Sequence, residues 1–328
     1  MIKLDVKDRK LLYYLSLNAR QSHTQLSRKV GLSKNGVKYR IERLKKEGVI
    51  KKFTIVPNVA SCGYDTFNIL LKFNEDIYEN KEIINYFKDH GLCVWILTLS
   101  GGWDLFVEII VPNLSRMAAI IREINSHFGE VLNKYKVFYV ASGPVKLGDI
   151  LEDLYVDLKL EKPKPKKIIE KKQKLDIVDK KIMMILAKDS SLPLMSIARE
   201  LNTSLDIVRY RMKRLVNSNL ILKFDTNISL SQLGYTKYLC RISLHGGSEE
   251  RINAIKKRIS VDKDIIYAFF DVNGYNIMFT CAFKKTEDID HLLRGLRKDF
   301  SDIIEDQEYL LVKEEVLLNL FPKGLLEE

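Results

Sequence analysis

The chain has 328 residues, a length that predicts about two ordinary domains, each able to bury its own core. Its 54 Lys and Arg against 43 Asp and Glu give a formal net charge of +11, which favours a polyanionic partner, either nucleic acid or an anionic membrane surface. No apolar run reaches the roughly 18 residues of a membrane span, and the N-terminus lacks the apolar segment of a secretion signal. We therefore expect a cytoplasmic protein.

The first 50 residues predict a helix-turn-helix. Residues 8–18 form an amphipathic pattern, and residues 22–30 begin with a capping box and predict a second, short helix. Gly31 supplies the positive φ that a tight turn between helices requires. A third helix is expected to start after its cap, Ser33, and to run to about Glu47.

The third helix combines an apolar stripe with a basic face. Val37, Ile41 and Leu44 fall on one side at 100° per residue and are expected to pack on the first two helices. Residues 33–52 contain eight Lys or Arg and two Glu, a net charge of about +6. This charge favours a helix that lies in a phosphate-lined groove, and a merely solvated basic face is the alternative.

The whole module occurs twice in the chain. Residues 4–53 align without a gap on residues 175–224 at a constant offset, which indicates the repeat of a structural unit and not of a short motif. Asn202 takes the place of Gly31, and Asn is the next-best residue for that backbone conformation. The residues predicted to bind DNA are Ser33, Lys34, Asn35, Lys38, Tyr39, Arg43 and Lys46 in the first copy, and Ser204, Arg209, Tyr210, Lys213 and Arg214 in the second.

The two copies differ where they would touch DNA. Asn35 has the length and chemistry to read an adenine edge, whereas its counterpart Asp206 repels phosphate and can accept from a cytosine amino group. We therefore predict a non-palindromic operator. Arg40 lies beside the apolar stripe and is predicted to pair with Asp5 or Asp8 instead of DNA.

An alternating α/β region follows each helix-turn-helix. Its order is βαββαβ, which predicts an α+β fold of two repeats, each a helix-turn-helix domain followed by a ferredoxin-like sandwich. Helices cover one face of such a sheet, and the free apolar face predicts dimerisation. The strands are expected at residues 67–73, 94–99, 104–111 and 131–140, with helices at 81–90 and 114–128, and in the second half at residues 237–244, 265–272, 276–283 and 303–312.

These elements divide the chain into five segments. A connector is expected at residues 161–174, where two prolines and many lysines favour an extended, solvated chain, and a tether that also rests on phosphates is the alternative. The predicted domains are the helix-turn-helix domains at 1–57 and 175–228 and the sandwiches at 58–160 and 229–328.

The motifs together resemble the Lrp/AsnC (feast/famine) family of transcription regulators, and the resemblance covers nearly the whole chain twice. It rests on Leu4–Asp8, Val30–Ser33, Val37–Leu44, Gly48–Ile50 and Gly102–Asp104. It implies double-stranded DNA as partner, a winged or plain helix-turn-helix, pairing through the sandwich domains, and regulation by an amino acid or a related metabolite. Most members carry one unit, so two units predict a pseudo-dimer within one chain, with homo-oligomers as a further level.

A glycine-containing loop is the candidate effector site. A hairpin turn accounts for the glycines of the segment Gly101, Gly102, Trp103 and Asp104 without any ligand. In proteins of the resembled family this loop lies where small ligands bind, and the Asp104 carboxylate would pair with an amino group. The second half has Asn276 at the position of Asp104, so the first sandwich is the better candidate.

The spacing of the cysteines and histidines bears on catalysis and metal binding. The 4 Cys and 5 His share no metal-ligand or triad spacing, so we expect no metal, no cofactor and no catalytic residue. Two alternatives remain open. Siroheme decarboxylases resemble the same architecture, but that reading requires histidines in the sandwich loops and a third helix without basic character. A low-specificity architectural DNA-binding protein would use the same basic helices.

Overall fold

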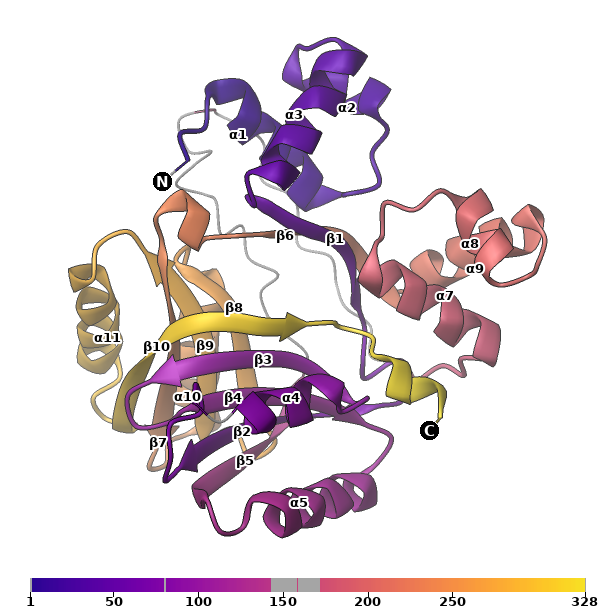
Figure 1. Ribbon diagram of the computed structural model, residues 1–328. Coiled ribbons are helices and arrows are strands. Elements are labelled where there is room, and N and C mark those ends of the chain that lie inside the picture. Colours follow the sequence, from indigo (N-terminus) through magenta and orange to yellow (C-terminus); the bar gives the residue numbers. More distant parts are fainter. Residues whose placement is uncertain (1, 80, 143–157, 159–171, 328) are drawn as a thin grey trace. The chain divides into compact units, whose positions relative to one another are not determined.

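The computed structural model describes residues 2–79, 81–142, 158 and 172–327 (Figure 1). Most of the predicted connector, residues 161–171, lies outside these described residues. The chain divides into two compact units that do not follow the order of the repeats. One unit gathers both helix-turn-helix regions, and the other gathers both sandwich regions. The first consists of Met1–Gly63, Leu151–Gly234 and Asn319–Glu327, and the second of Tyr64–Ile150 and Tyr235–Leu318.

The helix-turn-helix unit contains two copies of three helices. They are α1 (Val6–Leu17), α2 (His23–Val30) and α3 (Lys34–Lys46), followed by α7 (Ile177–Lys188), α8 (Leu194–Glu200) and α9 (Leu205–Asn217). The predicted capping box at Ser22 is confirmed at the start of α2, and Asp5 caps α1 in a reciprocal box of the same kind. Gly31 has φ 71° and Asn202 has φ 50°, so both copies make the predicted left-handed turn.

An antiparallel ribbon joins the two copies. Its strands are β1 (Ile50–Pro57) and β6 (Ile221–Ile228), and neither was predicted from the sequence. Each copy also donates a backbone hydrogen bond to the other copy's strand: Ala19 N–H to the carbonyl of Phe224 at 2.9 Å, and Ser190 N–H to that of Phe53 at 3.1 Å. Because each strand serves the helices of both copies, neither helix-turn-helix is structurally independent of the other.

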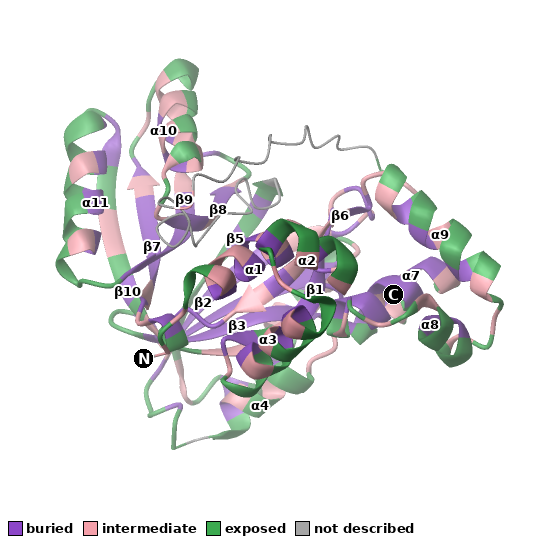
Figure 2. Cartoon of the chain, turned by 90° about the horizontal axis from the view of Figure 1, so that it is seen from above, coloured by how far each residue is buried: buried purple, intermediate pink, exposed green. Residues whose placement is uncertain are grey.

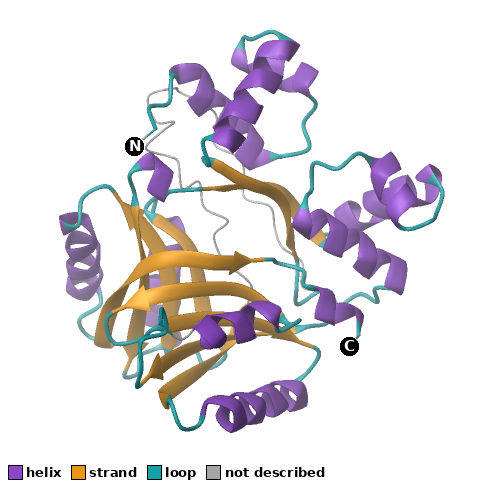
Figure 3. Ribbon diagram, viewed as in Figure 1, coloured by secondary structure: helices purple, strands orange, loops and turns teal. Residues whose placement is uncertain are grey.

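The sandwich unit contains the predicted ferredoxin-like order twice (Figure 3). In sequence order its elements are β2 (Asp65–Phe73), α4 (Lys81–Asp89), β3 (Cys93–Ser100), β4 (Leu105–Val111), α5 (Leu114–Phe128) and β5 (Leu132–Ser142), then β7 (Thr236–Leu244), α10 (Glu249–Val261), β8 (Ile265–Asp271), β9 (Asn276–Phe283), α11 (Glu287–Asp299) and β10 (Ile304–Leu318). All of the strand pairs in this unit are antiparallel.

The two sheets join edge to edge within the chain. Strand β10 pairs with β3 and strand β5 pairs with β8, so the described strands close into one barrel in the order β10-β3-β4-β2-β5-β8-β9-β7. The rings of Trp95 and Tyr267 lie 5.5 Å apart and those of Phe106 and Phe269 lie 6.5 Å apart, so aromatic side chains of both repeats meet in the interior. The apolar face that the sequence predicts for dimerisation is thus covered by the chain's own second repeat.

A buried carboxyl group lies among these interior residues. Glu108 stands opposite Asn68 on β2 and Trp95 on β3, and its Oε2 has no hydrogen-bond partner among the described residues. Burial raises the pKa of Glu108 from 4.5 to about 8, because the charged form is poorly solvated there. The folded unit therefore holds this carboxyl protonated at neutral pH.

The Glu108 carboxyl predicts a specific pH dependence of stability. Because the folded-state pKa is above the unfolded value, the free energy of unfolding should fall as the pH rises from about 5 to about 8, by at most about 1.4 kcal/mol per pH unit. Glu108→Gln, which resembles the neutral acid, should remove this dependence and be the more stable protein at the upper end. Urea unfolding of both proteins across this range measures the effect. Parallel pH profiles for the two would contradict the assignment.

Candidate nucleic-acid interface

Helix α3 presents the predicted basic face to solvent. Asn35, Lys38, Tyr39 and Lys46 are exposed, while the predicted stripe of Val37, Ile41 and Leu44 is at most 7% exposed. Figure 2 shows exposed residues along α3 and α9 on the side away from their buried stripes. These four side chains are therefore free of the core, and Lys38 Nζ lies 3.8 Å from a carboxylate oxygen of Glu42 on the same helix.

Helix α9 repeats this arrangement with different chemistry. Tyr210 is 69% exposed and its counterpart Tyr39 is 66% exposed, so each copy holds a large aromatic ring in solvent at the same position. Arg209 forms an ion pair with Asp206, and Lys213 is exposed. The acidic residue near the start of α9 thus neutralises part of the second basic face.

The two serines before these helices have a structural role. Ser33 Oγ accepts from the Gly36 N–H at 3.0 Å, and Ser204 Oγ accepts from the Ile207 N–H at 3.2 Å. Each serine therefore fixes the start of its helix. Lys34, next in the chain, is exposed at the same end of α3.

A buried carboxylate positions helix α3 against α1. Asp8 is 1% exposed and accepts from Arg40 Nη1 at 2.7 Å and from Arg43 Nη2 at 2.6 Å. Arg40 also pairs with Asp5 at 2.7 Å, which confirms the predicted intramolecular role of Arg40. These hydrogen bonds raise the pKa of Arg40 and of Arg43, because the carboxylates stabilise the charged guanidinium groups.

The second copy repeats the cluster with Asp179, which is fully buried, and with Arg211 and Arg214. Arg43 and Arg214 were both predicted to bind DNA, and sequence reasoning missed their pairing with these aspartates. The repeated Asp8 and Asp179 were the signal that could have revealed it. Two cations around one buried carboxylate explain why both copies keep the same three residue types.

In the loop between β3 and β4, both carboxylate oxygens of Asp104 accept hydrogen bonds. The Asp104 carboxylate accepts from Lys72 Nζ at 2.6 Å and from the Phe73 N–H at 2.8 Å. Trp103 is 5% exposed, and Gly101 adopts φ 132°, where an added Cβ would lie 2.9 Å from a methyl group of Leu310. Gly102 lies beside Glu308. The packing of this loop thus accounts for the left-handed glycine and for the buried tryptophan.

The described residues contain neither a metal site nor a membrane-spanning helix. Within residues 2–79, 81–142 and 172–327, His, Cys, Asp and Glu side chains form no group of three that could hold a metal ion. No helix in the described part of the chain is both long and apolar enough to cross a membrane.

Comparison with known proteins gives the same assignment for both repeats. The model of the winged helix-turn-helix DNA-binding family matches residues 4–51 and 175–221. An uncharacterized HTH-type transcriptional regulator of Pyrococcus abyssi is 32% identical over 120 residues, which are 36% of this chain and 80% of that protein. One of Pyrococcus horikoshii is 33% identical over 120 residues and equally covered. The chain belongs to the family of these HTH-type transcriptional regulators.

This HTH-type regulator is a tandem-duplicated form, with two helix-turn-helix regions, whereas each of these two relatives matches about a third of the chain. The crystal structure of the siroheme decarboxylase NirDL has the same overall fold. Its TM-score is 0.65 at 14% identity, over 98% of this chain and 96% of that one. At such low identity the likeness concerns the fold alone.

Proposed function

We propose that this protein is a sequence-specific transcriptional regulator of the Lrp/AsnC type that reads a non-palindromic operator with two unequal helices. The observation that carries the proposal is the single compact unit that contains α3 and α9 together. The β1–β6 ribbon links the two reading helices through paired strands, so one chain supplies both halves of a dimeric reading head. The sandwich faces that would pair two chains already pair within this one.

The two helices are proposed to recognise different half-sites of the operator. Lys38 and Lys46 neutralise phosphates beside α3, and Asn35, near the start of α3, reads a base edge. In α9, Arg209 and Lys213 provide the positive charge, while Asp206 repels phosphate and accepts from a cytosine. Because Asp206 is already paired with Arg209, the second half-site should contribute less affinity than the first.

Selection of binding sites from random duplex DNA tests this proposal. The expected result is one enriched sequence with two different half-sites, their centres separated by one helical turn or a multiple of it. Recovery of two identical inverted half-sites would contradict the unequal roles of α3 and α9. Binding without enrichment of any sequence would instead indicate an architectural DNA-binding protein.

Two substitutions on α3 should separate base reading from phosphate binding. Asn35→Ala is expected to alter preference at one operator position, with a discrimination change of about 1 to 3 kcal/mol. Lys46→Ala should weaken binding to all sequences alike and reduce the steepness of the salt dependence by about one phosphate contact. Competition titrations with single-base operator variants measure both. A sequence-specific effect of Lys46→Ala would contradict these roles.

The loop Gly101–Asp104 remains the proposed effector site for an amino acid or related metabolite. The support is the Asp104 carboxylate, which could pair with an amino group after Lys72 moves away, since Lys72 Nζ now lies 2.6 Å from it. Calorimetric titration with the amino acids, repeated with Asp104→Asn, tests the site. A heat of binding that Asp104→Asn leaves unchanged would contradict this loop as the effector site. No heat of binding with any of the amino acids would contradict it as well.

A further inference from the structure

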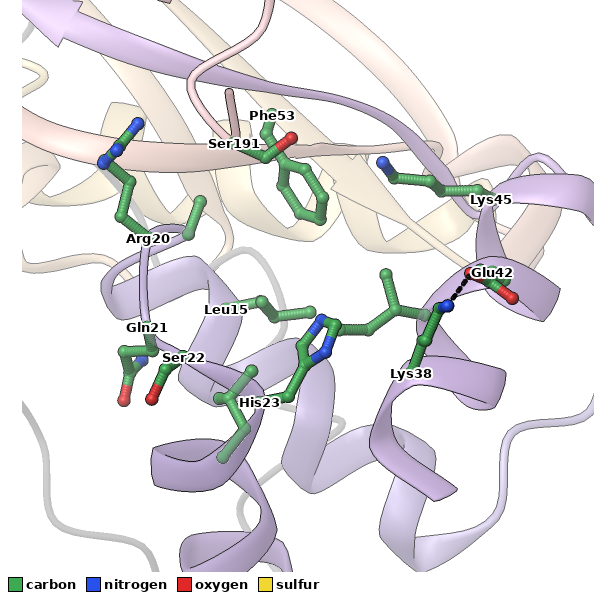
Figure 4. A pocket seen from close by; sticks show the side chains of 13 residues that line it. Leu15, Arg20, Gln21, Ser22, His23, Lys38, Glu42, Lys45, Phe53 and Ser191 are labelled. Carbon is green, nitrogen blue, oxygen red and sulfur yellow. Dashed lines mark ion pairs between the residues drawn. The ribbon is translucent and has the colours of Figure 1, made fainter. Parts of the chain in front are cut away.

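A pocket of about 440 Å³ lies beside the reading helix of the first copy (Figure 4). Its apolar wall includes Leu15, Leu26, Ile41 and Phe53, which are at most 7% exposed. The pocket lies wholly within the helix-turn-helix unit, and Ser191 of the second copy completes its edge. Its volume is within the range of cavities that hold small organic ligands.

The rim of this pocket is mainly cationic. Lys38 and Lys45 of α3 line it together with Arg20, and Glu42 is its one carboxylate. The Glu42 carboxylate forms an ion pair with Lys38, whose Nζ lies 3.8 Å from Oε1 of Glu42. Lys45 Nζ lies 4.5 Å from the centre of the Phe53 ring, so a positive charge stands directly over an aromatic wall (Figure 4). The combination suits a ligand with one negative group and an apolar body.

The second copy shows which of these residues the fold itself requires. Its apolar residues Leu186 and Phe224 match Leu15 and Phe53, yet it forms the same three helices although several polar rim residues are replaced. The replacements, written from the first copy to the second, are Arg20 to Ser191, Gln21 to Leu192, His23 to Leu194 and Lys45 to Val216. Because the helix-turn-helix forms with apolar side chains at Leu194 and Val216, folding does not account for His23 and Lys45.

We infer that this pocket binds a small organic carboxylate with an aromatic or branched apolar body, and that the bound ligand opposes DNA binding. The carboxylate would lie near Lys45 and Lys38, and the apolar body against Phe53 and Ile41. A bound anion cancels positive charge on α3 and occupies Lys38, which the DNA complex needs. The effect on DNA rests on the proposed function, whereas binding of the carboxylate does not.

Direct binding is measured first, on the full chain without DNA. Benzoate is the probe, with benzamide as the uncharged match and inorganic phosphate as an anion without an apolar body. Saturable benzoate binding at about 1 mM or tighter is expected by calorimetry, with both controls at least about tenfold weaker. Absence of saturable benzoate binding would overturn the inference. Phosphate binding as tight as benzoate would also overturn it, because the site would then be a plain contact for DNA phosphate.

A pair of neighbouring variants locates the ligand. Lys45→Val installs the second copy's residue and should weaken benzoate binding about tenfold. Lys46→Val removes the same charge from the same helix, but Lys46 does not line the pocket, so benzoate binding should persist. Melting temperatures establish that both variants fold, and Lys45→Gln replaces Lys45→Val if the latter does not. Equal loss in the Lys45 and Lys46 variants would show an effect of net charge and contradict the pocket.

The effect of the bound carboxylate on DNA binding is measured separately, as a change in operator affinity. Benzoate at saturation should weaken operator binding by about tenfold in the parent protein and in Lys46→Val, each compared with the same protein without benzoate. It should not weaken operator binding in Lys45→Val. Benzoate that binds without changing operator affinity would contradict this effect and leave the ligand site intact. Failure of the parent protein to bind any duplex would count against the proposed function instead, because the calorimetric result is independent of DNA.

Discussion

Asp8→Asn is expected to lower the free energy of unfolding of the helix-turn-helix unit by about 3 kcal/mol, which corresponds to a fall of roughly 10 °C in melting temperature. Asp8 is 1% exposed and holds Arg40 and Arg43 at 2.7 and 2.6 Å. Removing its charge leaves two partly buried guanidinium groups without their shared partner, and this costs more than an exposed ion pair. Urea unfolding followed by circular dichroism measures the loss.

The control for this prediction is Glu42→Gln, which removes an exposed carboxylate from the same helix-turn-helix. The Glu42 side chain is 64% exposed and lies 3.8 Å from Lys38, so its loss should change stability by less than about 0.5 kcal/mol. Similar small effects for both substitutions would contradict the structural role of Asp8. A gain of stability in Asp8→Asn would contradict it more strongly.

The affinity for operator DNA is expected to fall about a thousandfold when the salt concentration rises from about 50 to about 200 mM. Two basic helices on one duplex contact roughly 6 to 10 phosphates, and each contact releases condensed counterions whose free energy depends on salt. The net charge of +11 is consistent with such a partner. Fluorescence anisotropy of a labelled operator over this range gives the slope.

Charge removal from one helix at a time is the matched control for the salt slope. Lys46→Ala in α3 and Lys213→Ala in α9 should each reduce the slope by about one contact, because both lysines are exposed on the reading helices. A slope that is unchanged by Lys213→Ala would mean that α9 does not touch the duplex. Affinity that does not respond to salt would contradict the whole electrostatic basis of binding.

The helix-turn-helix was predictable because its signals are local. Asp5, Ser22 and Ser33 each cap the helix that follows, and Gly31 supplies the left-handed turn, so a few neighbouring residues determine each boundary. The sandwich strands were also predictable, because they alternate with amphipathic helices in a recognisable order. The predicted strand at 303–312 was too short, since β10 continues to Leu318 to reach its second partner, β3.

The features that escaped prediction depend on distant parts of the chain. Strand β1 pairs with a strand about 170 residues away, and most of its residues are buried, so it lacks the alternation that marks a half-exposed strand. The partner of each free sheet face was the other repeat, which periodicity cannot identify. On α3, Arg43 was placed on the DNA side by helical angle, but its long side chain reaches back to Asp8.

Hydroxyl-radical footprinting of a single chain on its selected operator shows whether α3 and α9 bind the same duplex together. Two unequal protected patches are expected on one side of the duplex, about one helical turn or a multiple of it apart. Lys46→Glu in α3 should erase the stronger patch, and Lys213→Glu in α9 should erase the weaker. One patch that only the α3 substitution removes, or no protection at low salt, would contradict this joint binding.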